Sequence, residues 1–133
     1  LVQIAAGIAG VLAAHVMFDL ALFQLSTTPR TGVGQWSAEF VATFGLVFVI
    51  LGCLKARPES VPMAVGLYIT AAYWFTSSTS FANPAVTVAR SLSDTFAGIA
   101  PSDAIPFIAV QIVAAIVATY VTGLLFPDRG PSS

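Results

Sequence analysis

The sequence predicts an all-α membrane protein that forms a single membrane domain over residues 1–133. Of its residues, 57% are hydrophobic and only 8% are charged, which is far more apolar than a soluble domain. In hydrocarbon every backbone polar group must be paired internally, so only helices or a closed barrel can cross. The apolar stretches run about 17 to 25 residues, the length of a membrane-spanning helix, whereas barrel strands have about 10.

The first half of the chain predicts two crossings. Residues 1–25 form a long apolar stretch whose many Ala and Gly residues permit close helix approach. Residues 26–35 contain Pro and Gly and predict a loop. Residues 36–54 form a second apolar stretch with one acid, Glu39, and we expect a second span there.

The second half predicts two more crossings and one half-crossing. A charged turn over 55–62 leads into a third span over 61–79. The next segment, 81–94, is too short to cross a core of about 30 Å at about 1.5 Å per residue, so it reaches about halfway. Turn residues separate it from a last span over 104–126 and a polar tail, 127–133. We therefore expect four transmembrane helices and one re-entrant half-helix.

The charged residues indicate an orientation and exclude one class of partner. Lys55 and Arg57 fall in one short loop and Arg129 falls on the same side, whereas Arg30 falls on the other. Basic residues favour the cytoplasmic side, so we expect the first three to lie there. Five scattered basic residues and a net charge of −1 give no basic face, so nucleic acid is not an expected partner.

A short internal repeat links the first and last spans. The seven residues 2–8 match 110–116 at five positions, including Gln3 and Gln111, although apolar stretches also match by chance. Asn83 lies 28 residues before Gln111, so a matching half-helix is expected about 28 residues before Gln3. Duplicated membrane folds place their pathway where two such broken helices meet.

The sequence Asn83-Pro84-Ala85 predicts the start of the half-helix. Asn is a favoured N-cap, and Pro suits the first helical position. Because this helix starts within the membrane, its positive end faces the interior, where it repels cations and protons. The capping Asn83 keeps two amide hydrogens to donate, which favours a neutral, hydrogen-bonding guest. The alternative is an ordinary capped helix in a loop of a soluble domain.

The segment 80–87, Ser-Phe-Ala-Asn-Pro-Ala-Val-Thr, resembles the aquaporin (major intrinsic protein) family, as do the Gln-containing spans, the Glu39 span and the repeat. The resemblance implies a right-handed bundle of six spans, two half-helices that meet end to end, and a homotetramer in the lipid bilayer with one pore per subunit. This chain would correspond to spans three to six with the second motif, so the first two spans and the first half-helix would precede it. A bacterial inner membrane is the expected location.

One departure from the family pattern bears on selectivity. The motif is usually followed by a constriction arginine, but that position is Val86 here, and Ala71 and Ser80 occupy the other constriction positions. A wider, less polar constriction implies a passive channel for glycerol, urea or uncharged metalloid hydroxides, together with water. The resemblance includes a bacterial subgroup associated with arsenic handling. Arg90 would lie one helical turn deeper than Val86, or would fold back to replace the missing arginine.

The resemblance also assigns structural roles to three polar residues within the spans. Glu39 is expected to accept hydrogen bonds from backbone amides of residues 76–82, because a charge in a span needs partners. Gln3 and Gln111 are expected to support the bases of the half-helices. The function that follows is not enzymatic and needs no cofactor or metal. A water-selective aquaporin, a non-conducting scaffold and an intramembrane enzyme remain as alternatives.

The enzymatic alternative depends on a few further polar residues. His15 and Asp19, spaced i, i+4, would share a helix face and suggest a metal pair or an acid–base pair, but no third ligand is evident. Ser77, Ser78 and Ser80 could be combined with His15 into a hydrolase site, which requires an activated nucleophile and an oriented base. Nothing in their spacing specifies one, so we expect His15 and Asp19 to face a headgroup region or a neighbouring helix.

Overall fold

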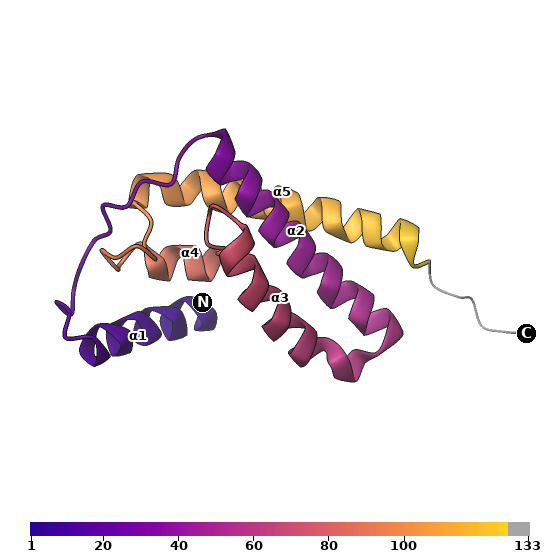
Figure 1. Cartoon of the computed structure of the whole chain (residues 1–133), viewed down its shortest axis with the longest axis horizontal. Helices are drawn as coiled ribbons and strands as arrows, with labels where there is room; N and C mark the ends of the chain where they lie inside the picture. Colours follow the sequence, from indigo (N-terminus) through magenta and orange to yellow (C-terminus); the bar gives the residue numbers. More distant parts are fainter. Residues whose placement is uncertain (128–133) are drawn as a thin grey trace, which may run out of the picture.

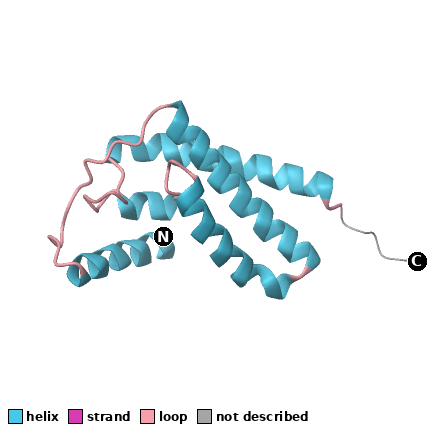
Figure 2. Cartoon of the chain, in the orientation of Figure 1, coloured by secondary structure: helices cyan, strands magenta, loops and turns pink. Residues whose placement is uncertain are grey.

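The computed structural model of the chain describes residues 1–127 and consists of helices joined by loops (Figures 1 and 2). The prediction of an all-α fold is confirmed for these residues. The elements, in chain order, are α1 (Val2–Met17), α2 (Val33–Ala56), the short 3-10 helix η1 (Pro58–Ser60), α3 (Val61–Phe75), α4 (Pro84–Arg90) and α5 (Pro101–Leu125).

The helices α2, α3 and α5 pack into one group, with α2 lying against both others. The Tyr68 hydroxyl of α3 donates to the carbonyl of Ala42 on α2, at 3.0 Å. This contact requires Gly45, because a Cβ atom there would lie 2.1 Å from the Tyr68 oxygen. At the C-terminal end of α2, Lys55 donates to the Phe126 carbonyl and joins the ends of α2 and α5.

The half-helix α4 lies between α1 and α5, the two helices that the internal repeat relates. Gly7 of α1 allows a close approach, since a Cβ atom there would lie 3.0 Å from the Cβ of Ala89. On the other side, Gln111 of α5 donates to the Thr87 hydroxyl of α4 at 2.8 Å. Helices with matching sequences therefore flank the same half-helix.

The first helix ends at Met17, eight residues before the end of the predicted span. The Leu20 amide donates to the His15 carbonyl at 2.9 Å, and the Asp19 amide donates to the Val16 carbonyl at 3.4 Å. Asp19 has a φ of 54°, which completes a left-handed helix end of the Schellman type. Asp19 is therefore outside the helix, and the prediction that it shares a helix face with His15 is wrong.

Other boundaries differ from the predictions by a few residues. The turn at Gly32, which has a φ of 95°, lets α2 begin at Val33. The third helix stops at Phe75, because Thr76 takes an extended conformation with φ −104° and ψ 136°. Three residues within 79–82 have positive φ values and keep the chain from resuming a helix before Asn83. The half-helix has only 7 residues, and Pro101 starts α5 three residues earlier than predicted.

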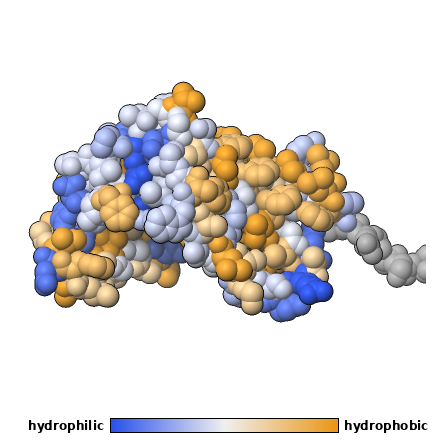
Figure 3. All heavy atoms as spheres, viewed as in Figure 1, coloured by the Kyte–Doolittle hydropathy of each residue, from blue (hydrophilic) through white to orange (hydrophobic). Residues whose placement is uncertain are grey.

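Two helices, α2 and α5, are long and apolar enough to cross a membrane. The other two candidates, α1 and α3, have 16 and 15 residues, fewer than the roughly 20 that a straight crossing needs. Crossing by α1 and α3 therefore stays a prediction. In Figure 3, hydrophobic atoms cover much of the surface over α2 and α5, and hydrophilic atoms gather over the loops and at the turn of η1.

The charged residues lie at opposite ends of the helix group. Lys55 and Arg57 lie at the η1 turn, which the Lys55 contact with Phe126 places beside the end of α5. Arg30 lies in the loop at the other end (Figure 1). Which end is cytoplasmic stays a prediction, and Arg129, also used in it, lies outside the described residues.

The loop between α1 and α2, residues 18–32, is bound along the loop that follows the half-helix, residues 91–100. The Ser26 amide donates to the Ser91 carbonyl at 2.9 Å, and the Ala100 amide donates to the Thr28 carbonyl at 2.8 Å. The Thr28 hydroxyl donates to a further carbonyl in the same loop. Main-chain hydrogen bonds thus join two loops about 70 residues apart in sequence.

Candidate functional site

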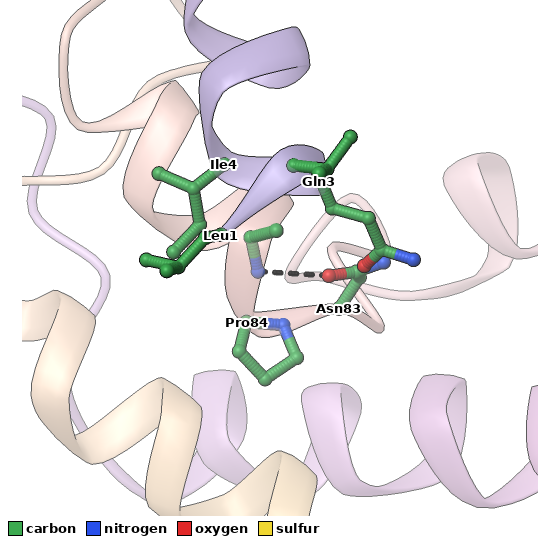
Figure 4. A pocket seen from close by; sticks show the side chains of 7 residues that line it. Leu1, Gln3, Ile4, Asn83 and Pro84 are labelled. Carbon is green, nitrogen blue, oxygen red and sulfur yellow. Dashed lines mark hydrogen bonds between the residues drawn. The ribbon is translucent and has the colours of Figure 1, made fainter.

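The tip of α4 has the predicted capping geometry. The side-chain oxygen of Asn83 accepts a hydrogen bond from the Ala85 amide at 2.8 Å, and Pro84 occupies the first helical position. The Asn83 nitrogen therefore keeps both of its hydrogens for another acceptor. Figure 4 shows the side chains of Asn83 and Gln3 among the residues that line the pocket at this tip. Residues 1–4 and 83–85 line a cavity of about 460 Å³ there.

Glu39 is fully buried and holds the segment that precedes the half-helix. Its carboxylate accepts from the backbone amides of Phe81 at 3.2 Å and Ala82 at 2.5 Å. It also accepts from the side-chain nitrogen of Gln111, at 2.8 Å, and this nitrogen contacts Thr87 as well. Both amides lie within residues 76–82, the segment that Glu39 is expected to contact, and its supporting role stays a prediction.

The two glutamines predicted to support half-helices differ in the structure. Gln111 is buried and joins α5 to both Glu39 and α4. Gln3 is exposed, and within residues 1–127 its side chain has no hydrogen-bond partner. The counterpart half-helix is not among the described residues, so the support expected of Gln3 stays a prediction.

Arg90 folds back over the segment that leads into its own helix. Its guanidinium donates to the Thr79 hydroxyl at 2.8 Å and to the Ala97 carbonyl, and its carbon lies 3.6 Å from the centre of the Phe81 ring. Cations bind favourably over aromatic faces at this distance. Arg90 therefore folds back, whereas its replacement of the missing constriction arginine stays a prediction. Because α4 runs from its capped tip toward the loops (Figure 1), Arg90 lies nearer the loop end than Val86, not deeper.

Arg30 is the functional candidate that sequence reasoning missed. It is 5% exposed, and its guanidinium donates to three main-chain carbonyls, those of Gly98 (2.6 Å), Ser78 (2.8 Å) and Phe96 (2.7 Å). It also lies 5.0 Å from the Phe81 ring centre. Burial lowers the pKa of Arg30, and the charge of Glu39 partly offsets this. Its partners are backbone atoms, so residue types gave no signal for this role.

The three predicted constriction positions lie in different surroundings. Ser80 is buried, and its hydroxyl has no hydrogen-bond partner within the described part of the chain. Val86 is 36% exposed on α4. Ala71 is exposed on α3, which does not pack against α4 among the described residues. The structure therefore leaves Val86 and Ala71 uncovered and does not bring α3 against the half-helix.

His15 joins two loops rather than forming a catalytic pair. Its Nδ1 lies 2.9 Å from the Leu22 carbonyl oxygen, which can only accept, so Nδ1 carries the hydrogen. Its Nε2 lies 3.0 Å from the Ser93 hydroxyl. Its partner is therefore none of the three serines that the sequence suggested. Residues 1–127 also contain no group of His, Cys, Asp and Glu side chains that could hold a metal.

Comparisons with known proteins identify the family. No protein-family model and no solved structure matches the chain. Among curated proteins, it is 52% identical to aquaglyceroporin AqpS of Rhizobium meliloti (strain 1021) over 128 residues. The match covers 96% of this chain and 55% of the relative, so the chain spans about half of that protein's length. On this similarity, the chain is an α-helical membrane protein that belongs to the aquaporin (major intrinsic protein) family.

Proposed function

We propose that this chain contributes the half-helix α4 to a passive membrane channel for small neutral solutes. The observation that carries this proposal is the capped tip of α4. Its Asn83 oxygen is engaged by the Ala85 amide, so the amide hydrogens remain available to a solute in the adjoining cavity. The same tip carries the positive end of the helix dipole, which disfavours cations.

The proposed solutes are larger than water and uncharged: glycerol, urea and metalloid hydroxides such as arsenous acid, with water passing as well. Val86 and Ala71 present small apolar side chains at the constriction positions. Ser80, at the third constriction position, has a buried hydroxyl without a hydrogen-bond partner among residues 1–127. The similar protein is named an aquaglyceroporin, which supports glycerol among these solutes.

The proposed architecture places α1, α2, α3 and α5 as four crossings of a right-handed bundle, with α4 as the re-entrant half-helix. A counterpart half-helix would meet α4 at the cavity lined by residues 1–4 and 83–85. The exposed Gln3 would then be the analogue of Gln111 on the counterpart's side, as the internal repeat suggests. We further propose a homotetramer in a bacterial plasma membrane.

Solute flux into proteoliposomes tests the proposal, measured by stopped-flow light scattering. The sample is the complete gene product that contains residues 1–133. We expect glycerol, urea and water to enter faster than in empty liposomes, with no enzymatic turnover required. Water flux alone would favour a water-selective aquaporin, and background flux for every solute would favour a non-conducting scaffold.

The constriction is tested by substitution of Val86. Val86→Arg adds a long cationic side chain at a position that is 36% exposed, so glycerol and urea flux should fall while water flux continues. Val86→Leu is the matched control, because it adds bulk without charge. Glycerol flux that is equal in Val86→Arg and wild type would show that position 86 does not line the pathway.

A further inference from the structure

The face of α4 that carries Asn83 also carries a cation. With about 100° of rotation per residue, Val86 and Arg90 lie about 300° and 340° around the helix from Asn83. All three therefore fall within an arc of about 60°. Ala85 and Ala89, by contrast, are buried on another face of α4.

The Arg90 guanidinium is held in one place. It donates to the Thr79 hydroxyl and the Ala97 carbonyl, and it lies flat enough over Phe81 for a ring-centre distance of 3.6 Å. Phe81 is itself anchored, because its ring meets that of Phe107 edge-on at 5.4 Å in the apolar core. A planar guanidinium fixed by hydrogen bonds and ring stacking loses little further freedom when it acts on a passing solute.

A second cation, Arg30, lies near Arg90. Arg30 approaches the same Phe81 ring at 5.0 Å and is tied to three carbonyls of the surrounding loops. The buried carboxylate near them is Glu39, which is already bound by two backbone amides and by Gln111. A second carboxylate, Asp103, accepts from the Arg30 backbone amide at 2.8 Å. The acceptors of the Arg90 guanidinium among the described residues are a carbonyl and a hydroxyl, not a carboxylate, so its charge is not neutralised by direct pairing.

We propose that Arg90 is the cation-excluding residue of this pathway, one helical turn outward from a wide and neutral constriction at Val86. An arginine at position 86 would set both the size limit and the charge barrier of the pathway. In this chain, Val86 sets the size limit and Arg90 sets the charge barrier, at different positions along α4. Bulky neutral solutes pass Val86, and cations and protons are repelled by Arg90, with Arg30 adding to the same field. This inference rests on the proposed channel function.

Ion leak measured beside solute flux tests this proposal, with the complete gene product in proteoliposomes. Arg90→Gln should raise Na⁺ and proton leak about tenfold or more, because the electrostatic barrier is lost, while glycerol flux stays within about twofold. Arg90→Lys keeps the charge and should keep the leak near that of wild type. Arg57→Gln, at the opposite end of the helix group, is the matched control and should change neither readout.

The outcomes separate this inference from the proposed function. Wild-type glycerol flux at background would disprove the channel itself. A conducting wild type whose leak is unchanged by Arg90→Gln would overturn only the inference, as would an Arg90→Lys variant that leaks as much as Arg90→Gln. The double variant Val86→Arg/Arg90→Gln moves the cation back by one turn, and it should restore low leak while excluding glycerol. If Arg90→Gln does not reach the membrane, Arg90→Met, which removes the charge and keeps an apolar chain over the Phe81 ring, replaces it in the same comparison with Arg90→Lys.

Discussion

Replacement of Glu39 should release the segment that positions the half-helix. In the folded chain its carboxylate accepts from the Phe81 and Ala82 amides and from Gln111. Glu39→Leu leaves two buried backbone N–H groups without an acceptor, each at a cost of about 1–3 kcal/mol. The expected loss of unfolding free energy is therefore about 2–6 kcal/mol. The upper value is a limit, because the substitution also removes the free-energy cost of burying the Glu39 charge.

Glu39→Gln should fall between wild type and Glu39→Leu. Its single carbonyl oxygen can accept from one of the two amides, whereas its NH₂ group points a donor at the other. We expect a loss of about 1–3 kcal/mol, which corresponds to one unsatisfied donor. The order of stability, wild type above Gln above Leu, follows from the number of acceptors that remain.

Unfolding in mixed micelles with increasing SDS, followed by fluorescence of the two tryptophans, measures these differences. Glu59→Gln, an exposed acid in η1, is the matched control and should stay within about 0.5 kcal/mol of wild type. Combining Glu39→Leu with Gln111→Leu should give a non-additive loss, since the two side chains are hydrogen-bonded. The reasoning fails if Glu39→Leu unfolds within about 0.5 kcal/mol of wild type.

Three further predictions use the same unfolding measurement. Asn83→Ala removes the cap and should cost about 1 kcal/mol, whereas Asn83→Ser, which can still cap, should cost less; equal losses would argue against the cap. Gly45→Ala places a Cβ atom 2.1 Å from the Tyr68 oxygen and should cost about 1–3 kcal/mol; Tyr68→Phe should recover little of this loss, because two ring carbons would still lie 2.6 and 2.9 Å from that Cβ, and recovery to wild-type stability would contradict the predicted clash. Hydrogen bonds from the Thr27 amide and hydroxyl lower the pKa of Asp94 from its ordinary value of 3.8, so Asp94 stabilises the fold above that pH. The stability difference between wild type and Asp94→Ala should therefore close as the pH falls through this lowered pKa, and a gap that persists in acid would contradict it.

The features that the sequence predicted well depend on local rules or on side chains with few possible partners. The Asn83-Pro84 start of α4 follows from capping preferences, and a carboxylate within a span, Glu39, must find donors nearby. The end of α1 was missed because Asp19 takes the left-handed position that glycine usually fills. The positions of Arg30 and Arg90 could not be derived in detail, since most of their acceptors are main-chain carbonyls that any residue supplies.

The hydrogen bonds between loop 18–32 and loop 91–100 have a consequence for biogenesis. The ribosome makes residues 18–32 about 70 residues before residues 91–100, so the earlier loop is already exposed on its side of the membrane when α4 emerges. If α4 is re-entrant, as proposed, the Ser26 amide and the Arg30 guanidinium would be in place to donate to the carbonyls of a segment that enters the bilayer without crossing it. These hydrogen bonds would then hold the re-entrant segment at its depth in the membrane.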